Sequence, residues 1–262
     1  AVIEGDVVNA ISLDLDGGAD DADARAAVSA EDIAQGDTLD LSDLATGARV
    51  DLDINNQGVL QDPTNGGLTE EGTITVGEAV ADVENFENVI GTDFNDVIFG
   101  NAQNNVLIGG DGDDALHPFG GEDFVDGGAG TDVLLLNGFG TGQFVDVAAG
   151  IAGNANETGD GIADGATINQ FINIENINGS SVAGDIMIVD DSVNSMYGLC
   201  GDDTINAQGG NDTLLGGEGN DTLVGNRGND EVFGEAGDDL VIWNNGDGSD
   251  LLNGGEGDDR VQ

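Results

Sequence analysis

A nine-residue repeat recurs along the sequence from Gly109 onward. Its form is Gly-Gly-x-Gly-x-Asp-x-apolar-x, and the segments 109–117, 127–135 and 216–224 match every fixed position. Gly-x-Asp at the fourth and sixth positions occurs ten times, whereas this composition would give it at a chosen place only about 3% of the time. Such a period indicates a repeat architecture in which each unit buries its apolar residue against its neighbours.

The repeat forms two blocks. Asn95–Ile98 and Asn104–Leu107 keep the sixth and eighth positions without the glycines, so the first block extends back to about residue 82. A second block begins near Val189 and continues to the end of the chain. The eighth position is apolar in all ten copies: Leu116, Val125, Leu134, Ile205, Leu214, Leu223, Val232, Val241, Leu252 and Val261.

The nonapeptide resembles GGxGxDxUx, the calcium-binding repeat of the repeats-in-toxin (RTX) family, in which U is a large aliphatic residue. The resemblance covers roughly half of the chain. It implies a parallel β-roll in which the first six residues of each nonapeptide turn around a Ca²⁺ ion and the last three form a short strand. Two nonapeptides then make one 18-residue coil.

This resemblance assigns calcium ligands to the sixth positions and to the glycine turns. The side-chain ligands would be Asp96, Asn105, Asp114, Asp123, Asp132, Asn194, Asp203, Asp212, Asp221, Asp230, Asp239, Asp250 and Asp259. The turn glycines would be Gly110, Gly112, Gly121, Gly128, Gly130, Gly201, Gly210, Gly217, Gly219, Gly228, Gly237 and Gly257.

Residues 18 apart share one edge of such a roll, so each pair of them defines one expected site. The core pairs are Asp96–Asp114, Asp114–Asp132, Asn105–Asp123, Asp203–Asp221, Asp221–Asp239, Asn194–Asp212 and Asp212–Asp230. Asp230–Asp250 and Asp239–Asp259 span 20 residues, and we expect them to be distorted or empty. We therefore expect roughly seven to nine Ca²⁺ ions, with the weakest binding where asparagine replaces aspartate.

Physical chemistry leads to a cation independently of the family. Each coil buries only two aliphatic side chains, too few for hydrophobic burial alone to hold the roll. Stacked carboxylates at the roughly 5 Å spacing of paired strands repel by roughly 1 to 3 kcal/mol. A hard dication with roughly six to eight oxygen ligands removes this repulsion, and glycine turns with positive φ offer carbonyls that complete its shell. Calcium binding and folding are then one event.

The predicted fold class is all-β, with two parallel rolls joined and preceded by β-rich segments. We expect a β-rich N-terminal segment at 1–81, a first roll at 82–135, a β-rich connection at 136–188 and a second roll at 189–262 that continues beyond the fragment. Residues 85–91 match 173–179 at an offset of 88, so the two units look duplicated. Extra strands are expected at 49–53, 73–76 and 143–147, which alternate apolar and polar residues.

The N-terminal segment carries two further expectations. Ala22–Gln35 has the only helix-like composition and is expected to form a short helix. An acidic cluster precedes and overlaps it, comprising Asp14, Asp16, Asp20, Asp21 and Asp23. The cluster fails the EF-hand pattern, which leaves a solvated loop and a further Ca²⁺ site as alternatives.

The charge of the chain excludes several partner classes. Fifty-three acidic residues against four basic ones, all arginine, give a net charge of −49 at pH 7. Binding to nucleic acid or to an anionic membrane surface depends on Lys and Arg, so neither is expected. No apolar run approaches the roughly 20 residues of a membrane span. Residues 1–6 carry neither an initiator Met nor a signal peptide, and we expect an excised piece of a longer protein.

Catalytic motifs are absent from the sequence. One histidine, His117, cannot build a two-histidine zinc motif, and one cysteine, Cys200, cannot form a disulfide within the chain. His117 occupies an outward ninth position and is expected to be a surface residue. Cys200 is expected to be an ordinary turn-tip residue rather than a functional thiol. Trp243, in a two-residue insertion, is expected to cap a bulged strand rather than to stack on a sugar.

These observations predict a non-catalytic calcium-binding β-roll segment of a secreted or cell-surface bacterial structural protein of the matrix, surface-layer or adhesin type. The family resemblance implies type I secretion and folding outside the cell. The alternative is the carrier module of a secreted protease, lipase or polysaccharide epimerase whose catalytic domain lies outside this chain. The expected partners are calcium ions and, through calcium, a second copy of the chain or a cell surface.

Overall fold

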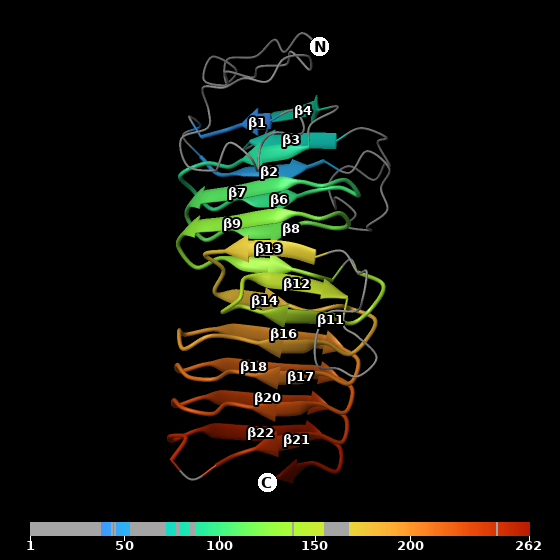
Figure 1. Cartoon of the computed structure of the whole chain (residues 1–262), viewed down its shortest axis with the longest axis vertical. Helices are drawn as coiled ribbons and strands as arrows, with labels where there is room; N and C mark the ends of the chain where they lie inside the picture. The colour runs from blue at the N-terminus through green and yellow to red at the C-terminus, as the bar shows by residue number, and fades with distance from the viewer. Residues whose placement is uncertain are drawn as a thin grey trace. The chain divides into compact units, whose positions relative to one another are not determined.

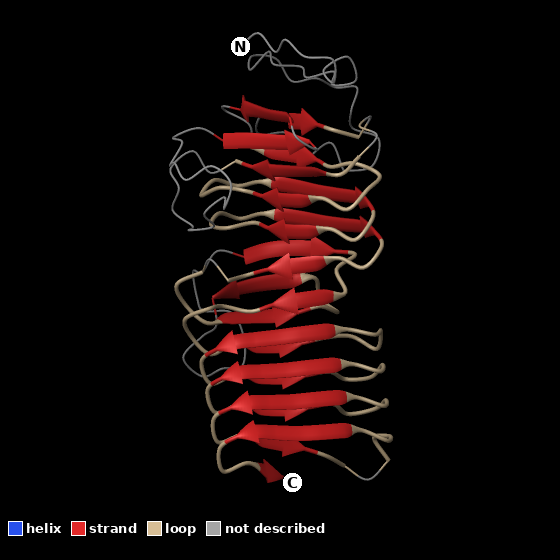
Figure 2. Cartoon of the chain, turned by 180° about the vertical axis from the view of Figure 1, so that it is seen from behind, coloured by secondary structure: helices blue, strands red, loops and turns tan. Residues whose placement is uncertain are grey.

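Strands are the only regular elements in the described part of the chain, as the sequence predicts (Figure 2). The computed structural model describes residues 38–42, 44, 46–52, 72–76, 79–83, 87–137, 139–154, 168–244 and 246–262. The expected helix at 22–35 and the acidic cluster at 14–23 lie outside these residues. None of the described segments is a helix long and apolar enough to cross a lipid bilayer. The chain divides into two compact units, Ala1–Asp132 and Val133–Gln262.

The first unit winds back and forth between two sheets. Its described strands are β1 (Thr38–Asp40), β2 (Ala48–Asp51), β3 (Gly72–Val76), β4 (Ala79–Val83), β5 (Asn88–Ile90), β6 (Val97–Phe99), β7 (Val106–Asp111), β8 (Ala115–His117) and β9 (Phe124–Ala129). One sheet has the order β1-β5-β7-β9 and is parallel throughout. The other has the order β8-β6-β2-β3-β4 and becomes antiparallel from β2 onward.

The second unit repeats this plan over more coils. Its described strands are β10 (Val133–Leu135), β11 (Gln143–Asp146), β12 (Ile151–Asn154), β13 (Ile168–Ile172), β14 (Asn176–Asn178), β15 (Ile186–Ile188), β16 (Ser195–Cys200), β17 (Thr204–Asn206), β18 (Thr213–Glu218), β19 (Thr222–Val224), β20 (Glu231–Ala236), β21 (Leu240–Ile242), β22 (Leu251–Glu256) and β23 (Arg260–Val261). One sheet has the order β13-β12-β11-β15-β17-β19-β21-β23, and the other β10-β14-β16-β18-β20-β22. Figure 1 shows β16, β18, β20 and β22 stacked as successive rungs.

Strand pairing confirms the 18-residue coil. Val97 lies opposite Ala115 in the first unit, and Thr222 lies opposite Leu240 in the second. The strands predicted outside the repeats are also present: β2 pairs in parallel with β6, and β11 pairs in parallel with β15. Across the two-residue insertion, Glu231 lies opposite Leu251, so the register there is 20 residues and the pairing is continuous.

The strands of the repeats have two lengths, which the repeat did not predict. Three-residue strands such as β8 and β19 match the expectation for the last three positions of a nonapeptide. The expectation is wrong for β7, β9, β16, β18, β20 and β22, which are six residues long and continue through positions 1–3 of the next nonapeptide. These positions stay extended because neighbouring coils go on pairing there, as Gly110 does with Gly128.

The eighth-position residues form the core, as predicted. Eight of the ten are at most 2% exposed: Leu116, Val125, Leu134, Ile205, Leu214, Leu223, Val232 and Val241. Ile98 and Leu107 of the degenerate copies are fully buried as well. Leu252 is half-buried and Val261 is 62% exposed, because both belong to the outermost strands of their sheets. Each coil thus contributes a single pair of aliphatic side chains to a narrow core.

Candidate metal centre

The sixth-position aspartates form a hydrogen-bonded ladder along each edge of a roll. The backbone N–H of one sixth-position residue donates to Oδ1 of its counterpart in the next coil, as Asp203 does to Asp221 at 2.8 Å. All nine predicted pairs are joined in this way, at 2.8–3.0 Å. The ladder therefore fixes one carboxylate oxygen of each Asp and leaves the other directed elsewhere.

The second carboxylate oxygen is buried without a hydrogen-bond partner in a recurring set of these residues. The Oδ2 atoms concerned belong to Asp114, Asp203, Asp212, Asp221, Asp230 and Asp239, and each of these residues is 1% exposed. A buried carboxylate oxygen with no donor carries a large desolvation cost. Its recurrence once per nonapeptide points to a missing positively charged partner rather than to a local irregularity.

The glycine at position 1 lies directly against this oxygen in most turns. A Cβ placed on Gly216 would lie closer than 3.0 Å both to Oδ2 of Asp221 and to the carbonyl oxygen of Gly234 in the next coil. Gly109 has the same relation to Asp114 and to Gly127. Real Cβ atoms do not approach oxygen so closely, so these two positions require glycine, although Ala207 takes the place in the turn that ends at Asp212. Glycine thus brings one carboxylate oxygen and one backbone carbonyl oxygen close together, and both are calcium ligands.

Burial shifts the acid–base behaviour of these carboxylates. Desolvation, reinforced by neighbouring carboxylates such as Asp221, raises the pKa of Asp203 to about 8. Desolvation likewise raises the pKa of Asp123 to about 8, of Asp114 and Asp212 to about 7 and of Asp221 to about 6. The pKa values of Asp230 and Asp239 are also raised, mainly by desolvation. Hydrogen bonds from the backbone oppose these shifts without cancelling them, so the ladder is strained when no cation is present.

Comparison with known families agrees with this geometry. The family model described as RTX calcium-binding nonapeptide repeat (4 copies) matches residues 88–118, 119–138, 188–223, 215–242 and 244–262. The chain belongs to the RTX repeat family. A comparison with curated proteins gave no match. The RTX rolls of this chain are therefore calcium-binding β-rolls, and the roll itself is a non-catalytic structure.

Calcium fits the residues of the RTX turns. No three His, Cys, Asp or Glu side chains gather around one point in the described segments, so backbone oxygens must complete any metal shell there. A hard dication suits this donor set, because it accepts carbonyl and carboxylate oxygens together. Bound calcium would supply positive charge to the buried Oδ2 atoms of facing aspartates such as Asp203 and Asp221. The chain supplies the rest, by holding Oδ1 in the ladder and by placing glycine at position 1 where a Cβ would meet Oδ2, as at Gly216.

The turn glycines adopt the conformation that their assignment requires. All twelve have positive φ, from +101° at Gly128 to +154° at Gly130. Position 2 stays left-handed even where the repeat departs from glycine: Phe119, Gln208 and Asn226 each have φ of +60°. Leu199 and Glu235 follow at +77° and +76°. We call these open turns: they have positive φ at position 2 and comprise the turns that end at Asp114, Asp123, Asp132, Asp203, Asp212, Asp221, Asp230, Asp239, Asp250 and Asp259.

Three other turns use their position-6 side chain differently. Oδ2 of Asp96 accepts the N–H of Thr92 at 2.6 Å, and Oδ1 of Asn105 accepts the N–H of Asn101 at 2.8 Å. Asp185, which the repeat pattern did not single out, accepts the N–H of Ser180 on Oδ2 at 2.5 Å. We call 91–96, 100–105 and 179–185 closed turns, because the residue after the first glycine donates to the position-6 side chain and has no positive φ.

Asn194 lies between these two classes. Its Nδ2 donates to the carbonyl of Glu175 at 2.8 Å, while its Oδ1 is buried without a hydrogen-bond partner. The amide oxygen is therefore available to a cation, although it brings no charge.

Side chains at position 5 form a second hydrogen-bonded ladder, which the sequence did not predict. The N–H of Asn220 donates to Oδ1 of Asp202 at 2.8 Å, and the N–H of Asp238 donates to Oδ1 of Asn220 at 2.9 Å. These bonds run from the later coil to the earlier one, opposite to the ladder at position 6. The frequent Asn and Asp at position 5 was the available signal. Each turn is thus held to its neighbour by two side chains before any metal binds.

His117 and Trp243 were singled out in the sequence, and the structure places the first in the interior and the second at the surface. His117 is only 2% exposed, so the prediction of a surface residue is wrong. Its ring stacks on Phe119 at 3.8 Å between centroids, and Nδ1 accepts the N–H of Phe119 at 3.2 Å. Trp243 is 42% exposed, and its backbone N–H donates to the carbonyl of Gln262 at 2.8 Å. The tryptophan thus continues the strand pairing at the insertion.

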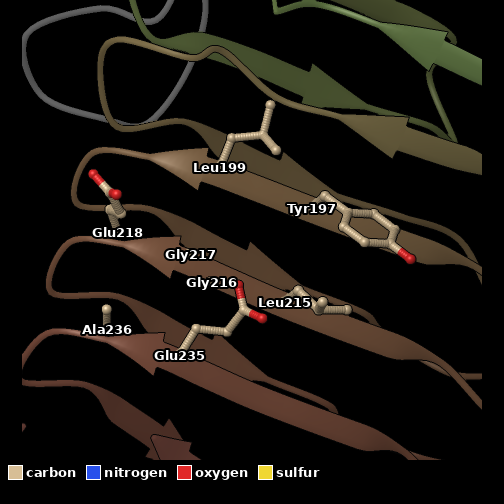
Figure 3. Close-up of a pocket in the computed structure, with 8 residues that line it drawn as sticks. All are labelled: Tyr197, Leu199, Leu215, Gly216, Gly217, Glu218, Glu235 and Ala236. Atoms are coloured by element: carbon tan, nitrogen blue, oxygen red, sulfur yellow. The ribbon is translucent and has the colours of Figure 1, made fainter. Parts of the chain in front are cut away.

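A pocket lies over β16, β18 and β20 (Figure 3). Tyr197, Leu199 and Leu215 line it together with the paired glycines Gly216 and Gly217. The carboxylates of Glu218 and Glu235 and the methyl group of Ala236 complete the lining. The hollow exists because two successive glycines leave this part of the sheet without side chains.

Proposed function

We propose that the chain is the calcium-folded part of a secreted or cell-surface structural protein. The observation that carries this proposal is the row of buried aspartate oxygens without a donor, which recurs in six of the open turns. In a calcium-poor compartment these carboxylates have no counter-ion, so the roll is strained. At the millimolar calcium found outside cells the same residues favour folding.

A structural role is supported by the way the chain uses its residues. The closed-turn motif and the repeat block that follows it occur twice, so the chain is built by repeating one scaffold. Its single histidine is buried in an aromatic stack, and aspartates at positions 5 and 6 of the described repeats are engaged in the ladders. A net charge of −49 keeps calcium-free chains apart, and calcium lowers that repulsion. Assembly in response to calcium follows from these properties.

The alternative is a carrier module attached to a secreted enzyme. The repeats serve equally well in that setting, because a calcium-driven roll can promote folding of whatever precedes it. The two roles differ in what the loaded chain does on its own. A matrix or surface-layer component associates with itself or with a cell surface, whereas a carrier module stays monomeric.

Light scattering coupled to size exclusion separates the two roles. The purified chain is measured in chelator, in millimolar Ca²⁺ and in millimolar Mg²⁺ at the same ionic strength. A structural role predicts assemblies that form in Ca²⁺, dissolve on chelation and do not form in Mg²⁺. A folded, strictly monomeric species across the Ca²⁺ range would refute the structural role and favour the carrier module.

A further inference from the structure

We propose that the three closed turns are calcium-free caps that begin each roll, and that a turn cannot bind calcium where the N–H of position 2 donates to the position-6 side chain. This hydrogen bond is present in the three closed turns, none of which has positive φ at position 2. The turn that ends at Asn194 also lacks positive φ, but its Oδ1 accepts no hydrogen bond and stays available. The orphaned Oδ2 atoms belong to open turns only. Backbone conformation and carboxylate state therefore change together.

The closed turns have no oxygen left to offer a cation. Oδ2 of Asp96 accepts the N–H of Thr92, while Oδ1 accepts the Thr92 hydroxyl at 3.1 Å and the N–H of Ala48. Asp185 is held alike by the N–H groups of Ser180 and Gln143, both at 2.5 Å. Each N–H presents its positive end where calcium would sit. A cation would have to displace this donor and leave it buried without an acceptor.

The residue type at position 2 favours the closed form in two of the three closed turns. Thr92 stands where the nonapeptide has its second glycine, and a β-branched residue strongly disfavours positive φ. Ser180 occupies the equivalent place after Gly179. Residue type alone does not separate the two forms, because Asn101 lies in a closed turn whereas Asn226 and Leu199 lie in open turns. The conformation and the hydrogen bond of position 2, rather than its residue type alone, thus separate a metal turn from a cap.

The duplicated motif Glu-Asn-x-x-Gly followed by Thr or Ser supplies the rest of the cap. The carbonyl of Glu87 accepts Nδ2 of Asn105 at 2.7 Å, and the carbonyl of Glu175 accepts Nδ2 of Asn194 at 2.8 Å. Asn88 accepts the N–H of Val106 on its Oδ1 at 2.9 Å.

Asn176 repeats this last contact in the second unit, where its Oδ1 accepts the N–H of Ser195 at 3.0 Å. The first coil of each unit is therefore joined to the next by hydrogen bonds alone. Because the same contacts arise in two separate units, they are a property of the motif and not of one local environment.

The proposal changes the number of calcium sites. Two of the nine expected pairs, Asp96–Asp114 and Asn105–Asp123, contain a closed-turn residue and hold no calcium between their members. The remaining seven pairs are the calcium sites. This assignment rests on calcium binding by the open turns. It adds that each roll starts from a coil whose position-6 carboxylate is hydrogen-bonded without metal, as at Asp96 and Asp185, and that this coil is a fixed edge for the coils that calcium then orders.

Calcium stoichiometry of the full chain tests the assignment. Equilibrium dialysis with ⁴⁵Ca²⁺ is performed on the unchanged chain, on Asp96→Asn, on Asp221→Asn and on the double variant Thr92→Gly/Phe94→Gly. The double variant converts 91–96 into Gly-Gly-x-Gly-x-Asp, an open turn. We expect it to bind one more Ca²⁺ than the unchanged chain. Asp96→Asn should keep the original number, and Asp221→Asn should lose at least one ion.

Leu199→Gly is the matched control, because it adds a glycine at position 2 of a turn that is already open. It should leave the number of ions unchanged. Far-UV circular dichroism at saturating calcium shows that each variant has folded. Loss of one ion in Asp96→Asn, or no added ion in a folded double variant, would overturn the cap assignment while leaving calcium binding intact. An unchanged chain that binds no calcium would instead refute the proposed function as well.

Discussion

Asp221→Ala should weaken the calcium-dependent folding of the second unit strongly. Asp221 is 1% exposed and lies in the middle of one edge ladder. Its Oδ1 accepts the N–H of Asp203 and its own N–H donates to Asp239, each at 2.8 Å. Alanine leaves the Asp203 N–H buried without an acceptor, which costs about 1 to 3 kcal/mol. It also removes a charged ligand from two proposed sites.

The size of the effect follows from these losses. A tenfold loss of affinity at each of the two sites is about 1.4 kcal/mol per site, so the total reaches about 4 to 6 kcal/mol. Six calcium sites are proposed for the second unit, and cooperative folding spreads the loss over all of them. Each ion then loses about 0.7 to 1 kcal/mol, which corresponds to a rise of roughly three- to fivefold in the calcium midpoint.

Circular dichroism during a calcium titration measures this midpoint. Glu218→Ala is the control, because Glu218 is an exposed residue of the same turn, three positions before Asp221. Its midpoint should stay at the value of the unchanged chain. Asp221→Asn keeps an acceptor for the Asp203 N–H and removes only the charge, so its midpoint should lie between the other two. Equal midpoints for Asp221→Ala and Glu218→Ala would show that the assigned register is wrong.

Three further outcomes follow from the same structure. At neutral pH the chain should be largely disordered in chelator and become β-rich in millimolar Ca²⁺. Mg²⁺ should substitute poorly, because it requires shorter, octahedral coordination. A circular dichroism spectrum that does not change with Ca²⁺ would contradict this prediction. Burial raises the pKa of Asp123 and Asp203 to about 8, above the unfolded value of about 3.9, so the calcium-free fold holds extra protons and loses stability as pH rises from about 4 to 8. Circular dichroism in chelator should therefore show more β-structure at pH 5 than at pH 8, and the opposite order would exclude this linkage. Gly216→Ala should raise the calcium midpoint, because its Cβ would collide with Oδ2 of Asp221. The Cβ of the control variant Gly140→Ala meets no atom within 4 Å, so that variant should keep the midpoint of the unchanged chain. An unchanged midpoint for Gly216→Ala in the same titration would show that glycine is not required beside Oδ2 of Asp221.

The periodic part of the fold could be predicted because it depends on spacing alone. Position 8 gives the core, position 6 gives the ladder and the 18-residue interval gives the register, as Leu116, Asp114 and the pairing of Val97 with Ala115 show. The core, the ladder and the register can all be predicted without knowing any contact between residues far apart in the sequence, because each coil packs only on its neighbours.

The residues that the repeat did not predict depend on how single turns close. Asp185 follows a glycine directly and ends a turn with one extra residue, so no Gly-x-Asp marks it. The ability of Asp96 to bind metal could not be judged from its position, because the decisive donor is the N–H of Thr92. His117 has an outward register yet is buried, because its ring stacks on that of Phe119. Such contacts depend on side-chain orientation rather than on period.

The two-residue insertion around Trp243 has a consequence for how such rolls can change. Asp230 still donates its N–H to Asp250 at 3.0 Å, and Asp239 still donates to Asp259 at 3.0 Å, so the ladder resumes in register after the longer loop. The ladder therefore depends on the spacing between paired strands and not on the number of residues in the loop that joins them. Because lengthening a loop costs little closure entropy, foreign peptides placed between residues 243 and 247 should be displayed without unwinding the coils on either side.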